Sequence, residues 1–161
     1  MIVRLVGSEM CIRDSIWLSE NLPSNPNPKK LCWGDSRIGN VLFENFQVKS
    51  LLDWEMATIG DPLCDLAWGL TTDDVSSYGL NIEKLPGSIE NEEAIKFWEK
   101  NTGYSADNFF YYRILCLFKF SVIMIRVAKK LIHNEIMPLD SDFHVNNHVS
   151  NYLRQEFNEK N

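Results

Sequence analysis

Positive charge is scarce in this sequence. Its 161 residues carry 16 lysines and arginines against 22 aspartates and glutamates, which gives a formal net charge of -6 at pH 7. Proteins that bind nucleic acids or anionic membranes usually show clustered Lys and Arg, because these side chains neutralise phosphates. We therefore expect no nucleic acid and no membrane among the partners, whereas a small polar substrate is compatible with this charge.

The sequence also lacks a long apolar run and a signal peptide. The most apolar stretch, residues 109–131, is interrupted by Arg113, Lys119 and Arg126, whereas a membrane-spanning helix needs about 20 consecutive apolar residues. Near the amino terminus, Arg4 interrupts the apolar residues before the core of a signal peptide could form. The sequence therefore predicts a cytoplasmic protein without a membrane span.

Cysteine and histidine occur without the spacing of a redox or metal motif. The four cysteines form no C-x-x-C pair, so we expect reduced thiols in packing positions. His144 and His148 stand four residues apart, as zinc ligands do on one helix face, but no third ligand is evident. Solvated side chains are the simpler interpretation of both histidines.

The order of turn residues and apolar patterns predicts an α+β fold that is mainly helical. Pro23 stops a helix that ends near residue 18, and the apolar residues after position 106 cover most of a helix circumference, which is typical of a core helix. We expect residues 71–88 to be irregular, with Asp73 and Asp74 solvated. The expected elements are a strand at 30–33, a β-hairpin at 41–53 with its turn at 44–45, and helices at 63–70, 92–100, 106–133 and 140–157.

Three polar residues have the spacing of a phosphoryl-transfer site. Asp35 and Asn40 stand five residues apart, and Asp53 follows at the end of the next apolar run. In such a site one carboxylate orients the substrate hydroxyl, while an amide and a second carboxylate bind metal ions held on ATP. Asp35 is the candidate catalytic base. Asn40 and Asp53 are the candidate Mg²⁺ ligands, because Mg²⁺ prefers oxygen ligands.

The segments WGDSRIGN, LDW and GDPLCDLA together resemble the aminoglycoside phosphotransferase family. Its usual motifs read H-G-D-x-x-x-x-N, then (I/L)-D-(F/W), then G-D-P-x-x-D-L-A. The segment LDWEMATIGDPLCDLAW is most similar to the branch of this family that is fused to some acyl-CoA dehydrogenases. The resemblance implies the C-terminal lobe of a protein-kinase-like fold, in which a small β-hairpin carries the catalytic loop. It also implies Mg²⁺, ATP as phosphoryl donor, and a small-molecule hydroxyl substrate such as a hydroxyacyl thioester, an aminoglycoside, choline or homoserine.

Two aspartates near the start of the helix at 63–70 have supporting roles. Asp61 is the expected N-cap, with Pro62 at the first helical position, where no hydrogen-bond donor is missed. For Asp65 the resemblance implies hydrogen bonds to the backbone of the catalytic loop. A first-turn carboxylate that is favoured by the helix dipole is equally consistent with the sequence.

Three further residues surround the candidate site. Trp33 takes the usual His position of the motif and could brace the loop by packing, because it is a large aromatic residue. Arg37 could pair with Asp53 or Glu55 or reach a phosphate, and a structural ion pair is the simpler role. Glu55 is either a further metal ligand or, more simply, an exposed or Arg-paired carboxylate.

The sequence holds no G-x-G-x-x-G motif, and no strand-borne Lys precedes the catalytic loop. We expect residues 16–161 to form the C-terminal lobe without its N-terminal lobe, and therefore to be inactive alone. Residues 1–15 are expected to be a non-native leader, because GSEMCIRDS resembles translated adapter sequence. A non-catalytic kinase-like binding module is the alternative, and a metal-dependent hydrolase is less favoured because such enzymes show more ligands. The oligomeric state stays open.

Overall fold

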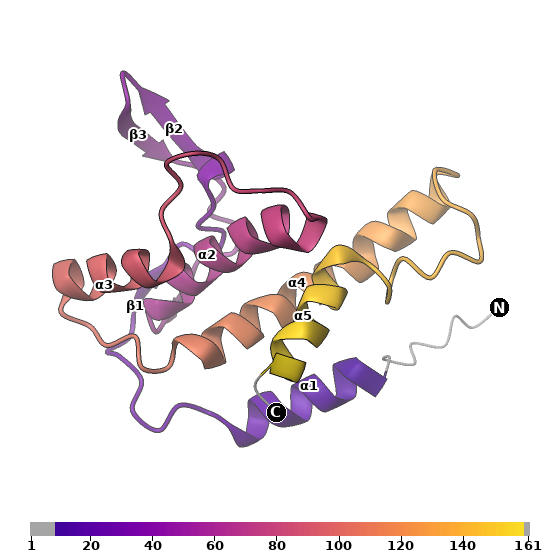
Figure 1. Cartoon of the computed structure of the whole chain (residues 1–161), viewed down its shortest axis with the longest axis horizontal. Helices are drawn as coiled ribbons and strands as arrows, with labels where there is room; N and C mark the ends of the chain where they lie inside the picture. The colour runs from indigo at the N-terminus through magenta and orange to yellow at the C-terminus, as the bar shows by residue number, and fades with distance from the viewer. Residues whose placement is uncertain (1–8, 160–161) are drawn as a thin grey trace. The chain divides into compact units, whose positions relative to one another are not determined.

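The computed structural model describes residues 9–159, which form helices and two small antiparallel sheets (Figure 1). The predicted α+β class is confirmed. Two compact units divide the chain: residues 23–116 form one, and the described residues up to Leu22 together with those from Leu117 onward form the other. All residues of the candidate site lie in the unit at 23–116. None of the helices within 9–159 is both long and apolar enough to cross a membrane.

Two pairs of strands frame the catalytic loop. Strand β1 (Lys30–Cys32) pairs with β4 (Thr58–Gly60), and β2 (Val41–Glu44) pairs with β3 (Gln47–Leu51). The predicted hairpin is therefore confirmed, with its turn at Asn45 and Phe46, one residue later than expected. Both turn residues have positive φ, 50° and 61°, as a two-residue turn of the primed type requires.

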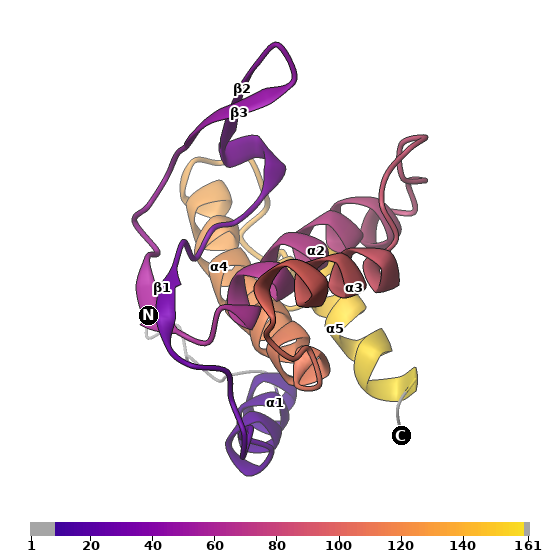
Figure 2. The same cartoon turned by 90° about the vertical axis from the view of Figure 1, so that its left-hand side faces the viewer.

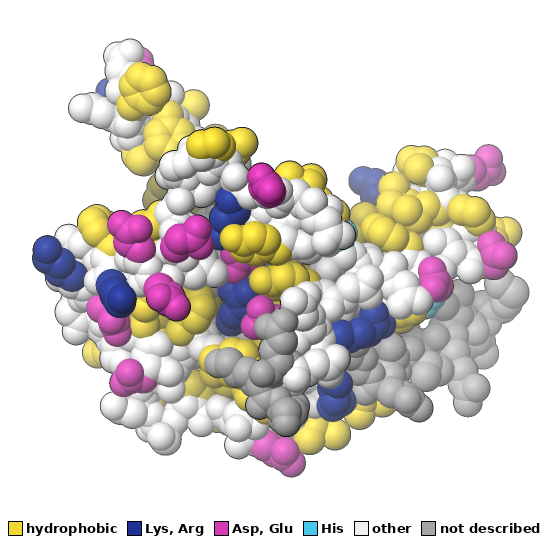
Figure 3. Space-filling view, viewed as in Figure 1, with side chains coloured by type: hydrophobic (Ala, Val, Ile, Leu, Met, Phe, Trp, Pro, Cys, Tyr) yellow, Lys and Arg dark blue, Asp and Glu magenta, His cyan; other side chains and the backbone are white. Residues whose placement is uncertain are grey.

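The β2–β3 hairpin extends away from helix α2 (Leu63–Ser77) in both views (Figures 1 and 2). Hydrophobic side chains gather on it (Figure 3), and Phe43, Phe46 and Val48 are among the exposed ones. The hairpin is held to the unit at its base, where the backbone N–H of Leu52 donates to the carbonyl of Asn40 at 2.8 Å.

Helix α2 continues to Ser77, seven residues beyond the predicted end. Hydroxyl groups on its polar second half donate back to carbonyls four residues earlier: Thr72 to Trp68 at 2.8 Å, and Ser77 to Asp73 at 2.8 Å. Such bonds satisfy the hydroxyl groups within the helix. The burial of Thr71, Thr72, Val75 and Ser77 explains why α2 continues where propensity alone would end it. After the short 3-10 turn η2 (Tyr78–Leu80), the chain reaches α3 (Asn91–Thr102) and α4 (Phe109–His133).

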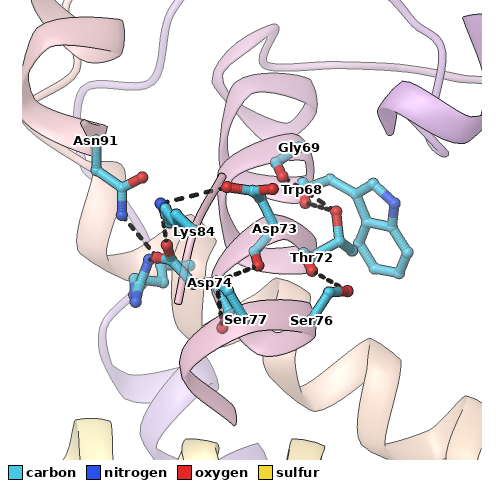
Figure 4. Close-up of polar contacts among 10 residues, drawn as sticks. Trp68, Gly69, Thr72, Asp73, Asp74, Ser76, Ser77, Lys84 and Asn91 are labelled. Carbon is cyan, nitrogen blue, oxygen red and sulfur yellow. Dashed lines mark hydrogen bonds and ion pairs between the residues drawn. The ribbon is translucent and has the colours of Figure 1, made fainter. Parts of the chain in front are cut away.

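Asp74 is buried, so the expectation of a solvated side chain was wrong. One carboxylate oxygen lies 2.8 Å from Nζ of Lys84. The other accepts hydrogen bonds from Arg113 at 2.7 Å and Asn91 at 2.6 Å, and Figure 4 shows this cluster. The carboxylate thus links α2, α3, α4 and the intervening loop.

The second unit contains α1 (Glu9–Glu20), the part of α4 from Leu117 onward and α5 (His148–Glu159). The rings of Trp17 and Phe157 meet edge to face, with their centroids 5.5 Å apart. Residues 9–15 belong to α1, while residues 1–8 lie outside the described part, so the predicted leader stays a prediction.

The helix predicted at 140–157 was wrong in its first half, because α5 begins only at His148. The side chain of Asn147 accepts hydrogen bonds from the backbone N–H groups of Val149 and Ser150, at 3.0 and 3.1 Å. These bonds satisfy donors that a helix start leaves free, so they favour a start at this point. His144 therefore lies outside the helix and shares no helix face with His148.

Candidate active site

The loop between β1 and β2 brings Asp35 and Asn40 together. The 3-10 turn η1 (Ile38–Asn40) places the amide of Asn40 so that Nδ2 donates to Asp35 Oδ2 at 2.6 Å and to its backbone carbonyl at 3.1 Å. Both residues are buried. Since Nδ2 is used inside the loop, the amide oxygen of Asn40 is the atom that could bind a ligand, and no donor to it is found among residues 9–159.

Two further donors reach the carboxylate of Asp35. The indole N–H of Trp68 donates to Oδ1 at 2.7 Å, and Nε of Arg37 donates to Oδ2 at 3.1 Å. Burial by itself raises the pKa of Asp35, but the hydrogen bonds from Trp68, Arg37 and Asn40 outweigh it and hold the pKa below its usual range. The carboxylate is therefore ionised at neutral pH and acts as an acceptor.

Arg37 pairs with a different residue than the sequence suggested. Its partner is Asp35 itself, at 3.1 Å, and within residues 9–159 it forms no ion pair with Asp53 or Glu55. The side chain of Arg37 is about half exposed, at 51%. It can therefore leave the carboxylate without moving any buried group.

Asp65, on the first turn of α2, binds the backbone that precedes Asp35. Its two carboxylate oxygens accept from the N–H groups of Trp33 at 2.7 Å and Gly34 at 2.8 Å. Ser36 Oγ donates to the backbone carbonyl of Asp65 at 2.6 Å. These bonds hold the start of the catalytic loop against α2, the role that the resemblance implied for Asp65.

Only glycine fits position 34. Its φ of +89° is in the left-handed region, and a Cβ there would lie 2.2 Å from the backbone oxygen of Met56. Gly69 of α2 permits a second close approach, because a Cβ there would lie 2.8 Å from the carbonyl oxygen of Ser36. The loop is therefore set by two backbone contacts that side chains would block.

Asp61 caps α2 and also joins the proline-rich connector to α4. Its Oδ1 accepts the N–H of Leu63 at 2.9 Å, and α2 begins at Leu63, as the range 63–70 predicted. Its Oδ2 accepts the N–H of Asn27 at 2.8 Å and the hydroxyl of Tyr112 at 3.1 Å. Asp61 therefore has a structural role, because it holds the start of α2, the connector and α4 together.

Asp53 follows the hairpin base with its side chain exposed. Its φ of +60° is unusual for a residue with a Cβ. The residue before it is held on both sides, since Leu52 N–H donates to Asn40 and Leu52 carbonyl accepts from the Trp33 indole at 2.7 Å. Asp53 therefore lies one residue beyond the bond that joins Leu52 to Asn40, and no hydrogen bond or ion pair of its carboxylate is found among residues 9–159.

Trp33 is buried at 9% exposure, and its ring centroid lies 6.0 Å from that of Trp54. The sequence suggested that Trp33 stabilises the loop by packing. Its indole hydrogen bond to the carbonyl of Leu52 is a second stabilising contact. Glu55 is exposed. Sequence reasoning missed Trp68 as a hydrogen-bond partner of Asp35, and the only signal for it was the Trp that follows the D-L-A motif.

Within the part of the chain that is described, no three or more His, Cys, Asp or Glu side chains gather into a metal cluster. Mg²⁺ does not need such a cage, because it usually takes one or two protein carboxylates together with substrate phosphates and water. The amide oxygen of Asn40 and the exposed carboxylate of Asp53 are oxygen atoms of the type that such a site uses. The donor set therefore fits Mg²⁺ and does not fit zinc.

A comparison with protein families matches residues 13–98, more than half of the chain, to the APH model, described as the phosphotransferase enzyme family. Acyl-CoA dehydrogenase family member 11 of Pongo abelii is 34% identical over 120 residues, which are 68% of this chain and 15% of that protein. The human protein of the same name is 49% identical over 55 residues, or 33% of this chain and 7% of that protein. The chain thus spans a small part of these relatives.

Among solved structures, a Ralstonia eutropha JMP134 protein assigned to the aminoglycoside phosphotransferases is similar to this chain, with a TM-score of 0.67 and 18% identity. The similarity covers 92% of this chain and 46% of that one. At this level of identity the match concerns the fold. It confirms the predicted kinase-like architecture.

Proposed function

This chain belongs to the phosphotransferase enzyme family, and we propose that it carries the catalytic loop of an ATP-dependent kinase that phosphorylates a small-molecule hydroxyl. Asp35 is the proposed base, and Asn40 and Asp53 are the proposed Mg²⁺ ligands. The observation that carries the proposal is the buried pair of Asp35 and Asn40, joined at 2.6 Å with the amide oxygen left for a ligand.

The hydrogen bonds of Asp35 suit the orientation of a hydroxyl. A carboxylate has about four acceptor positions, and Asp35 uses three for Trp68, Arg37 and Asn40. One position remains for a substrate O–H. A lowered pKa makes Asp35 a weak base, which is sufficient because phosphoryl transfer passes through a loose transition state that depends mainly on positioning.

Asn40 and Asp53 would hold the metal through one neutral and one charged oxygen. Bound Mg²⁺ neutralises charge on the phosphates of the nucleotide. The backbone bond from Leu52 N–H to the carbonyl of Asn40, at 2.8 Å, supports this proposal, because it ties the residue before Asp53 to the other proposed ligand.

The substrate class is proposed from the relatives. Two of them are named acyl-CoA dehydrogenase family members, which favours a hydroxyacyl thioester. The solved neighbour is assigned to the aminoglycoside phosphotransferases, so aminoglycosides, choline and homoserine belong in the same screen. We further propose a cytoplasmic protein whose partners are this small molecule and a nucleotide.

We propose that the 161-residue polypeptide by itself turns over little or no ATP, because its sequence holds no glycine-rich loop to cover the phosphates. The same observation favours the second candidate, a non-catalytic kinase-like binding module. The two candidates differ in whether the complete gene product that contains these residues transfers phosphate.

The deciding experiment measures ADP release by that complete gene product with each substrate class, at saturating ATP and Mg²⁺. An Asp35→Asn variant should lower kcat by about 10²–10⁴-fold, since it removes the acceptor of the hydroxyl proton. Asp73→Asn, an exposed change elsewhere in the same unit, is the matched control. Nucleotide binding without any turnover would support the binding module, and turnover that is unchanged by Asp35→Asn would overturn the assigned base.

A further inference from the structure

The peptide that precedes Asp53 is held by one side chain. The carbonyl of residue 52 and the N–H of residue 53 lie in one rigid peptide plane, and the indole N–H of Trp33 donates to that carbonyl at 2.7 Å. No other hydrogen bond to this plane is formed within residues 9–159. The orientation of the plane before Asp53 therefore depends on Trp33.

This plane matters because Asp53 has a left-handed backbone, with φ of +60°. Residues with a Cβ keep such a conformation only where the surroundings enforce it. If the carbonyl of Leu52 were released, the plane could rotate and Asp53 could relax toward an ordinary φ. The carboxylate of Asp53 would then point elsewhere.

Trp54 makes a similar hydrogen bond, but to a peptide plane whose orientation does not depend on it. Its indole N–H donates to the carbonyl of Leu51 at 2.8 Å. That carbonyl belongs to the plane between residues 51 and 52, which the bond from Leu52 N–H to Asn40 already holds at 2.8 Å. Trp54 is also 44% exposed, whereas Trp33 is 9% exposed. The two indoles therefore form a natural pair for comparison.

We propose that Trp33 is a positioning residue for Asp53, and that its ring N–H, rather than its bulk, presents the Asp53 carboxylate to a divalent metal ion. The inference rests on the proposed function, because it takes Asp53 as a metal ligand. It also explains how a Trp can stand where the usual motif has His, since both rings carry an N–H donor.

The test uses Mn²⁺ alone, added to the ¹⁵N-labelled 161-residue chain, with paramagnetic broadening of the Asp53 and Asn40 amide signals as the readout. Loss of one such hydrogen bond should weaken Mn²⁺ binding by about fivefold in Trp33→Phe. Trp33→His, which restores a ring N–H, should bind within about twofold of the wild type, as should the control Trp54→Phe. Urea unfolding verifies that each variant is folded, and Trp33→Leu replaces Trp33→Phe if the latter is not.

Each other result contradicts the inference in a distinct way. Equal weakening in Trp33→Phe and Trp33→His would show that bulk, and not the N–H, is what matters. Unchanged binding in Trp33→Phe would overturn the positioning role altogether. If the wild type itself shows no broadening at Asp53, the metal ligands of the proposed function fail, and this inference fails with them.

Discussion

Replacement of Asp74 by Asn tests whether the buried charge cluster holds the unit at 23–116 together. The change keeps the size of the side chain but removes its charge. In the wild type, the carboxylate lies 2.8 Å from Lys84 Nζ and 2.7 Å from Arg113 Nη1. The side chains of all three residues are nearly buried, at 1%, 8% and 9% exposure.

Removal of one partner from a buried ion pair costs about 3–5 kcal/mol, because the remaining charge stays out of water without its counter-charge. Lys84 would keep Asp73, which lies 3.2 Å from its Nζ. Arg113 would lose its 2.7 Å contact with the carboxylate, and we expect a loss of about 3 kcal/mol. With an m-value of about 2 kcal/mol/M, the urea midpoint should fall by about 1.5 M.

The same substitution should change how stability depends on pH. Burial alone raises the pKa of Asp74, but the bonds from Lys84, Arg113 and Asn91 outweigh it and hold the pKa below its usual value of 3.8. A carboxyl whose pKa is lowered by folding adds stability above its unfolded pKa, and that stability is lost as the pH falls through the folded pKa. The difference between wild type and Asp74→Asn should therefore be full at pH 6 and shrink below about pH 4.

Urea unfolding followed by far-UV circular dichroism at pH 6 and at pH 3.5 measures both effects. Asp73→Asn is the matched control, because Asp73 also pairs with Lys84 but is 55% exposed, so it should cost less than about 1 kcal/mol. The reasoning is refuted if Asp74→Asn loses less than about 1 kcal/mol, or if Asp73→Asn loses as much as Asp74→Asn.

Three further substitutions test the frame of the catalytic loop, each by urea unfolding. Gly34→Ala should cost at least about 3 kcal/mol. The control Gly103→Ala should cost about 1 kcal/mol, because Gly103 also has positive φ but no neighbour within 4 Å. Equal costs would contradict the close contact between position 34 and the backbone of Met56. Asp65→Ala should cost about 3 kcal/mol and Asp65→Asn less, because the amide keeps one acceptor for two backbone N–H groups. Tyr112→Phe should cost about 1 kcal/mol through loss of its bond to Asp61, and a neutral result would show that this bond does not contribute.

The elements that local chemistry defines could be predicted from the sequence. The Asp61-Pro62 pair marks the start of α2 to within one residue, and the alternation around residues 41–53 indicates the hairpin. Both depend on residues a few positions apart, where turn and capping preferences act directly. The proximity of Asp35 and Asn40 belongs to the same class, because both residues lie in one short loop.

Contacts between distant positions could not be predicted from local patterns, and only the resemblance implied the bonds from Asp65 to the loop. Asp74 was assigned to solvent because its neighbours in sequence are polar, and only the fold brings Arg113, 39 residues later, to its carboxylate. Likewise, Asp35, the proposed base, and its donor Trp68 are 33 residues apart. No periodicity encodes which buried donor meets which acceptor, since that choice depends on how the helices pack.

The two indole donors of the site suggest why a Trp can replace the usual His without loss of the loop. Trp33 donates to the peptide before Asp53, and Trp68 is one of three donors to Asp35, so an indole N–H contributes to the position of each proposed catalytic carboxylate. An indole N–H donates but cannot accept or titrate, unlike a His ring. The geometry of this loop should therefore be independent of pH over the range in which a His at position 33 would change its charge. If the Asp53 amide signal shifted between pH 5.5 and 7.5 in Trp33→His but not in the wild type, that difference would follow directly from the donor chemistry.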